Sequence, residues 1–186
     1  MKKYWLLALL CISIFSFSQE KQTRLKGNPL FLPVGMINLG IERELTDNIS
    51  LQGDVFISPW KSFKGKHLQV YMGHIEGRYY FKEVFSKWYV GLNMGGSVFD
   101  LQKWNYWNAD KYQRGFSIML GGVVGYQYQW NENWNIDFYL GGGFSQGFYH
   151  GYSSTEPIGR YESADHWNKS GEWIPYRGGI MISYKL

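Results

Sequence analysis

The chain has 186 residues with a formal net charge of +4, and 19% of its residues are aromatic. This length allows one domain, and the mean hydropathy of −0.34 is too polar for a bundle of membrane helices. Glycine is also frequent, with 23 residues, and this composition suits a β-barrel with a crowded interior and aromatic rings at membrane interfaces. No basic run or recognisable motif indicates binding to nucleic acid.

Residues 1–18 have the features of a cleaved signal peptide. Lys2 and Lys3 form a charged start, residues 4–17 an apolar core, and residues 16–18 a small-x-small cleavage site. The core is short for a membrane anchor, and no stop-transfer charges follow it. Cleavage would remove Cys11, the only cysteine, so we expect no disulfide or thiol chemistry in the mature chain.

Behind a polar leader at residues 19–23, we expect a single barrel domain at residues 24–186. Its first strand is predicted at residues 24–32, although the facing of that strand is ambiguous. Pro29 weakens this prediction, because a closed barrel has no free edge at which a missing donor is tolerated.

Seven further stretches alternate apolar side chains with small or polar ones, at the period of two that is typical of a β-strand. In chain order they are residues 35–45, 49–58, 67–81, 87–98, 115–130, 134–145 and 173–186. Short turns at residues 46–48, 82–86 and 131–133 alternate with longer loops at residues 59–66, 99–114 and 150–172.

The stretch at residues 67–81 keeps its alternation only in its second half. In the first half Leu68, Val70 and Met72 fall on the polar side. A β-bulge would restore the phase, and a mostly extracellular position of this half would also explain the pattern.

The final stretch, residues 173–186, places Tyr176 and Tyr184 on the apolar face and Arg177 on the polar face. Outer-membrane barrels usually end in an aromatic residue that the assembly machinery recognises. Leu186 departs from that rule, and Tyr184 lies two residues earlier on the same face.

Together the strands predict an all-β fold, an eight-stranded antiparallel transmembrane up-and-down β-barrel with short turns and both termini in the periplasm. The clearest pair, residues 115–130 and 134–145, carries Tyr and Trp beside its turn, as in a hairpin with an aromatic girdle. A soluble sandwich or lipocalin-like barrel is the structural alternative. In those folds the apolar face points inward. Here the other face consists of Gly, Ser, Asn, Gln and a few charges, from which a buried core cannot be built, whereas the lumen of a membrane barrel can.

Four short motifs give the chain a family resemblance: residues 35–42, Pro59-Trp60, residues 75–81, and residues 125–128 with Trp134-Asn135. Their order and spacing resemble the small outer-membrane β-barrel proteins of the "domain of unknown function 3575" family of Gram-negative bacteria, over about residues 26–186. The resemblance implies a barrel in the outer membrane, and it implies no known activity. Outer-membrane lipid and the barrel assembly machinery are then the expected partners of a monomer.

The predicted lumen contains ionisable side chains, which must be paired or hydrated. Alternation directs Glu42, Asp54, Glu76, Arg78 and Asp137 inward. We expect a structural charge network with Glu42 and Glu76 around Arg78, and the functional alternative is a gated ion or proton path. Eight-stranded barrels are filled by side chains, which disfavours a narrow pore.

One histidine suggests an enzymatic alternative, a lipid A deacylase-like activity. Such deacylases are eight-stranded barrels that use a His and a Ser two residues apart. Here His150 and Ser153 are three apart, which places them on opposite strand faces. Glu156, Glu162 or Glu172 is a candidate for the orienting acid, but the spacing disfavours catalysis, and we predict no catalytic residue.

Metal and cofactor sites are not predicted either. His67, His74, His150 and His166 are scattered through the chain and lack the HxH or HExxH spacing of metal ligands.

Three aromatic residues, Trp104, Tyr106 and Trp107, lie in a polar loop with Tyr112 nearby. They belong either to an interface girdle or loop packing, or to a surface patch that binds glycan or protein, since exposed aromatic residues favour recognition.

Overall fold

The computed structural model describes residues 21–63, 65–102, 110–155, 159–160 and 166–186. Within these ranges the chain is built from strands, with one short 3-10 turn, η1 (Leu32–Val34). The strands are β1 (Thr23–Gly27), β2 (Ile37–Glu44), β3 (Ile49–Phe63), β4 (Lys66–Tyr80), β5 (Lys87–Leu101), β6 (Lys111–Gln129), β7 (Trp134–Ser153), β8 (Gly159–Arg160) and β9 (Asn168–Lys185). None of the helical structure in these ranges is long and apolar enough to cross a membrane.

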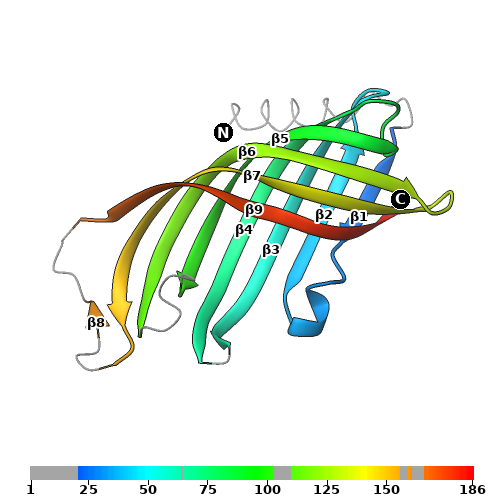
Figure 1. The fold of residues 1–186 in the computed structure, drawn as a ribbon. Helices are drawn as coiled ribbons and strands as arrows, with labels where there is room; N and C mark the ends of the chain where they lie inside the picture. The colour runs from blue at the N-terminus through cyan, green and yellow to red at the C-terminus, as the bar shows by residue number, and fades with distance from the viewer. Residues whose placement is uncertain (1–20, 64, 103–109, 156–158, 161–165) are drawn as a thin grey trace, which may run out of the picture.

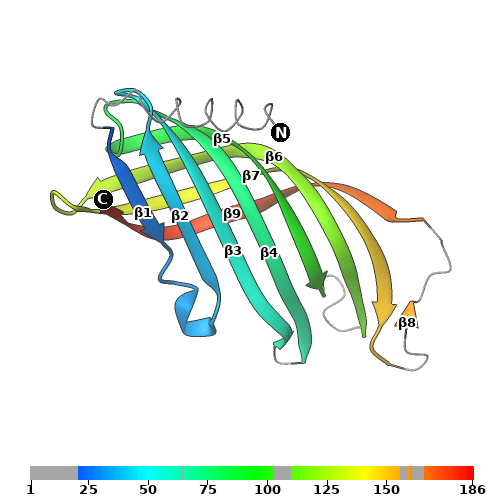
Figure 2. The same ribbon diagram turned by 180° about the vertical axis from the view of Figure 1, so that it is seen from behind.

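Eight of the strands form a closed ring (Figure 1). Each strand from β1 to β7 pairs antiparallel with the next, and β9 pairs with both β7 and β1. The two-residue β8 adds only to the end of β7. The predicted all-β, eight-stranded antiparallel up-and-down barrel is therefore confirmed, and Figure 2, the view from behind, shows β1 to β4 side by side in the wall that faces the viewer.

The connections divide the barrel into two ends. The short turns β2–β3, β4–β5 and β6–β7 lie at one end with the start of β1 and the C-terminus (Figure 1). There Leu186 N donates to Thr23 O at 2.9 Å and Lys185 N donates to Asn133 O at 2.9 Å. We call this the turn end and the opposite one the loop end.

The strands run further toward the loop end than the sequence indicates. β3 continues to Phe63 and β4 begins at Lys66, so most of the loop predicted at residues 59–66 is hairpin. The loops predicted at residues 99–114 and 150–172 also lose residues to β5, β6, β7 and β9. β6 and β7 have 19 and 20 residues, whereas roughly 9–11 residues suffice for a strand that crosses a membrane.

The first strand is shorter than predicted. β1 ends at Gly27, ahead of Pro29, which agrees with the cost of a missing donor within a closed sheet. The chain then passes through η1, and Gly35 ends this turn with a left-handed φ of 69°. Residues 28–32, predicted as strand, therefore belong to a connection at the loop end.

A β-bulge in β9 changes the facing predicted for Tyr176. Arg177 pairs with Gly141 and Ile174 pairs with Gly143, so Pro175 and Tyr176 together lie opposite Gly142. Tyr176 Oη consequently donates to Asn93 Oδ1 inside the barrel at 2.7 Å. The prediction that Tyr176 lies on the apolar outer face is wrong, because the bulge turns two consecutive side chains inward.

Glycines on the inner face make room for large side chains. A Cβ atom at Gly125 would lie 2.3 Å from the Tyr89 ring, and one at Gly95 would lie 2.3 Å from the His74 ring. The polar, glycine-rich face is therefore a packed interior, in which backbone and rings approach closely.

Candidate functional site

The outer face of the barrel is apolar and the inner face is polar. Large aliphatic side chains on the outside are more than half exposed; examples are Leu92 at 77%, Ile118 at 61%, Leu120 at 63% and Leu140 at 63%. The largest fully buried side chains include charged and amide groups: Lys26, Glu42, Gln52, Glu76, Arg78, Gln127, Asn135 and Asp137. This is the reverse of the usual distribution in a water-soluble domain.

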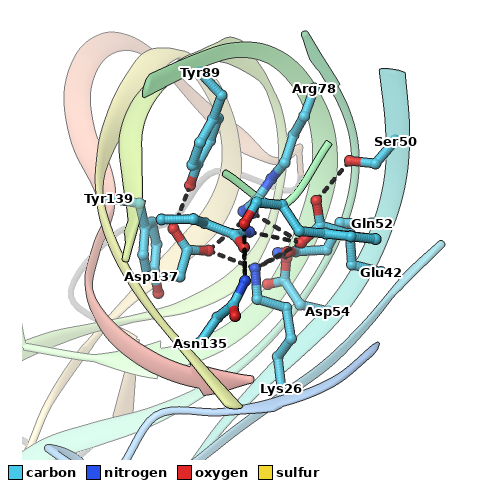
Figure 3. Close-up of polar contacts among 12 residues, drawn as sticks. Lys26, Glu42, Ser50, Gln52, Asp54, Arg78, Tyr89, Asn135, Asp137 and Tyr139 are labelled. Carbon is cyan, nitrogen blue, oxygen red and sulfur yellow. Dashed lines mark hydrogen bonds and ion pairs between the residues drawn. The ribbon is translucent and has the colours of Figure 1, made fainter. Parts of the chain in front are cut away.

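Four charged residues from four strands meet at the centre of the interior (Figure 3). Lys26 Nζ of β1 lies 2.7 Å from Glu42 Oε2 of β2, and it also contacts Asp137 Oδ2 of β7. Arg78 Nη1 of β4 lies 2.8 Å from Asp137 Oδ2 and 3.1 Å from Glu42 Oε2. Each carboxylate thus contacts both cations, which compensates the cost of burying all four.

Neutral donors complete the coordination of the two central carboxylates. Glu42 Oε1 accepts from Ser50 Oγ at 2.5 Å and from Tyr80 Oη at 2.6 Å. Asp137 Oδ1 accepts from Tyr89 Oη at 2.8 Å, and the Tyr89 ring also lies beneath the Arg78 guanidinium, 4.4 Å from its Cζ. Hydrogen bonds to every carboxylate oxygen are what a buried ionic cluster requires.

A second cluster adjoins the first on the side of the loop end. Arg177 Nη2 of β9 lies 2.7 Å from Asp54 Oδ2 and 3.1 Å from Glu76 Oε2. Glu76 Oε1 also accepts a hydrogen bond from Arg78 Nε at 2.5 Å, so Glu76 joins the two clusters. The His74 ring stacks on the Tyr176 ring at 5.7 Å, with Nδ1 3.6 Å from Asp54 Oδ1. We call the two clusters together the lumen network: Lys26, Glu42, Asp54, His74, Glu76, Arg78, Asp137 and Arg177.

The lumen network fills its level of the barrel. The side chains of Lys26, Glu42, Glu76, Arg78 and Asp137 have no exposed surface. The arrangement can therefore hold strands together across the interior. Among the described residues, these buried side chains leave no open path through the centre of the network.

Toward the loop end the inner face of the barrel becomes apolar and the outer face becomes polar. A cavity of about 150 Å³ in the interior is lined by apolar side chains that include Val70, Met72, Met119 and Ile174. β4 keeps an unbroken register with β5 from Leu68 to Tyr80, so the β-bulge suggested for this strand is absent from it. Val70 and Met72 break the alternation because the interior itself is apolar at this level.

The residues predicted for the lumen come together, and the sequence missed some of their partners. Glu42, Glu76 and Arg78 are in direct contact. Lys26 was missed because the facing of the first strand was ambiguous, although its alternation with Leu25 and Gly27 was a usable signal. Arg177 was placed on the polar face, but its pairing depends on the bulge, which the sequence does not indicate.

The other predicted positions do not form a site within the described residues. His150 stacks on Trp167 at 4.1 Å, and Ser153 Oγ donates to Thr155 O at 3.1 Å. Glu172 borders the apolar cavity of the interior, and Glu156 and Glu162 fall outside the described ranges.

Neither a metal centre nor the aromatic patch can be built from the part of the chain that the structure describes. Within it, no group of three or more His, Cys, Asp or Glu residues is placed to hold a metal ion. Trp104, Tyr106 and Trp107 lie outside the described residues. Tyr112, at the start of β6, is described and stacks between His67 at 3.8 Å and Tyr152 at 5.4 Å.

Comparison with known protein families gives a match over nearly the whole chain. The family model described as "Protein of unknown function (DUF3575)" matches residues 5–186. No curated protein matches the chain. The motifs that carry the resemblance also supply Glu42, Glu76, Arg78, Gln127 and Asn135 to the polar interior.

Proposed function

The chain belongs to the DUF3575 family, and we propose that it is an integral outer-membrane β-barrel with a structural or surface-interaction role and no catalytic activity. The observation that carries this proposal is the reversed polarity of the wall, apolar outside and ionic inside. In water the outer face would expose side chains such as Leu92 and Leu140, at a cost of about 25 cal/mol per Å² of apolar surface. In a bilayer the same face needs no further cover.

Ring closure supports the same proposal. Lipid offers no hydrogen-bond partner to the backbone, so a sheet can cross a bilayer only when every strand is paired on both sides. The pairing of β9 with both β1 and β7 meets that condition.

Aromatic pairs at the turn end fit a membrane interface. Trp88 contacts Tyr126 at 5.2 Å between ring centroids, and Trp134 contacts Tyr184 at 4.7 Å. Trp130 is 63% exposed beside them. A belt of Trp and Tyr is typical of the boundary of a membrane barrel, so the turn end is the proposed periplasmic side.

The exchange of polarity supports a position for the other boundary. On the outer face, Tyr71, Val98 and Phe116 lie on one line of paired residues, and Gln69, Asp100 and Arg114 lie on the next line toward the loop end. An apolar line followed by a charged one fits a strand that leaves lipid and continues into water. The parts of the strands between this charged line and the loop end then extend outside the membrane on the extracellular side.

A pore and an enzyme are less well supported. A pore would need a path past Lys26, Glu42 and Arg78, whose side chains have no exposed surface. A deacylase would need His150 and a nucleophilic Ser on one face, which their spacing does not provide. A lipid A mass shift on expression that disappears with His150→Ala would support the enzyme instead.

The test of the proposal is fractionation followed by semi-native electrophoresis. We expect the protein in the outer-membrane fraction, with an unheated band that migrates faster than the heated one. Recovery only in the soluble periplasmic fraction, or the absence of a heat-dependent shift, would overturn the proposal.

A further inference from the structure

A hollow on the outer face near the loop end is lined by cations and, on the side nearer the middle of the barrel wall, by apolar side chains. Its volume is about 240 Å³, and its lining includes Lys61, Gln69, Tyr71, Val98, Asp100 and Arg114. We call it the rim hollow. It lies outside the ring, away from the lumen network.

The guanidinium of Arg114 is held in place at the rim hollow. Arg114 Nη2 and Nε donate to Asp100 Oδ2 at 2.7 and 3.0 Å, while 55% of the Arg114 side chain stays exposed. The guanidinium also lies 5.2 Å from the Tyr152 ring and 5.9 Å from the Tyr112 ring. Lys61 is exposed at the other side of the hollow.

The one carboxylate of the rim hollow is already engaged. Asp100 Oδ2 receives Arg114, and Asp100 Oδ1 lies 2.7 Å from His67 Nδ1. With Asp100 paired, the lining keeps an excess of one positive charge from Lys61 and Arg114. Arg is suited to phosphate because it offers further donors in a planar fork.

The position of the hollow selects the kind of anion. Tyr71 and Val98 border it on the line of residues nearest the centre of the barrel wall, about 7 Å along the strand from Gln69 and Asp100. Below them the outer face continues with exposed aliphatic residues such as Ile118. An acyl chain can lie on this apolar surface while an attached phosphate reaches Lys61 and Arg114.

We propose that the rim hollow binds the phosphate of a phosphorylated glycolipid in the outer leaflet. Lys61 and Arg114 contact the phosphate, Tyr71 and Val98 contact the acyl region, and Asp100 with His67 holds Arg114 in place. This inference rests on the proposed outer-membrane location.

The experiment uses the full barrel in phosphatidylcholine nanodiscs, with bound lipid counted by native mass spectrometry. The probe is phosphorylated lipid A, and the same lipid without phosphate is the comparison. We expect Lys61→Gln and Arg114→Gln each to weaken binding of the phosphorylated lipid about fivefold, and the double variant about 30-fold. The phosphate-free lipid should bind the wild type as weakly as the phosphorylated lipid binds the double variant.

Lys87→Gln is the matched control, because Lys87 is an exposed lysine beside the Tyr126 ring, 5.8 Å away, at the turn end. We expect it to leave binding unchanged. Equal losses in this control, or equal binding of the phosphate-free lipid, would overturn the proposal. Displacement of the lipid by millimolar inorganic phosphate would assign the site to free phosphate and overturn the lipid as its ligand.

The heat-dependent band shift makes failure of the lipid-binding proposal distinguishable from failure of the proposed outer-membrane location. If the Lys61→Gln, Arg114→Gln double variant keeps the band shift, the outer-membrane fractionation and wild-type lipid binding, lipid binding at the rim hollow is refuted and the proposed location is not. Loss of the band shift in the wild type overturns the location.

Discussion

Arg78 Nη1 and Asp137 Oδ2 lie 2.8 Å apart in the centre of the barrel, although the two residues are 59 positions apart in the chain. Arg78 also contacts Glu42 and Glu76. One guanidinium thus contacts carboxylates from three strands, and the stability of the barrel should depend on it.

Replacement of Arg78 by Met should lower the free energy of unfolding by about 3–5 kcal/mol, because it leaves buried carboxylates without a cation. The measurement is urea unfolding of the folded barrel in detergent, together with the temperature at which the unheated band converts. Arg43→Met is the control, since Arg43 is exposed beside Glu42, and it should change stability by about 0.5 kcal/mol or less. Equal stability of Arg78→Met and the wild type would contradict the structural role of the network.

Lys26 and Asp137 should be energetically coupled. Lys26→Met removes the ammonium that contacts the Asp137 carboxylate, and Asp137→Asn removes one of the negative charges that offset the buried Lys26 ammonium. The double variant should therefore lose less than the sum of the single losses, by about 0.5–3 kcal/mol. A double-mutant cycle in urea measures this difference, and strict additivity would mean that the contact carries no coupling.

Gly125 should not tolerate a side chain. A Cβ atom there would overlap the Tyr89 ring, so Gly125→Ala should cost about 1–3 kcal/mol through overpacking. Gly77→Ala is the control, because a Cβ atom at Gly77 has no heavy atom within 4 Å. Thermal conversion of the unheated band compares the two, and combination with Tyr89→Ala should restore part of the loss caused by Gly125→Ala.

The aromatic loop residues Trp104, Tyr106 and Trp107 are the sequence-based candidates for recognition of a glycan or protein. We expect Trp104→Ala with Trp107→Ala to reduce binding of a cell-surface ligand about tenfold or more, because aromatic anchors dominate such surfaces. Binding of labelled glycans or proteins to expressing cells is the measurement. Unchanged binding at equal surface expression would remove these residues from the proposal.

Alternation along the strands was sufficient to predict the barrel, since one face repeats as apolar and the other as small or polar. It was also sufficient to direct Glu42, Glu76 and Arg78 inward. The prediction failed where the local environment changes. Val70 and Met72 line an apolar part of the interior, so at that level apolar side chains no longer mark the outside.

The pairing of the charges was less accessible to sequence reasoning. Tyr176 and Arg177 both point inward because Pro175 and Tyr176 lie opposite one residue of β7, and alternation assumes that no residue is inserted. Lys26 lies in a five-residue strand, in which its alternation with Leu25 and Gly27 is a short signal that does not show which carboxylates it pairs with. Contacts between strands distant in the chain depend on the register of the strands around the ring, which a single sequence does not specify.

The seam of the ring lies between β1 and β9, and these two strands supply Lys26 and Arg177. The four carboxylates of the lumen network come from β2, β3, β4 and β7, and Arg78 is the only arginine or lysine of the network on these four strands. The other two cations therefore lie on the two strands that meet at the seam. Closing the ring brings Arg177 of β9 against Asp54 of β3 and Glu76 of β4, so a sheet that fails to close leaves these two carboxylates without that cation.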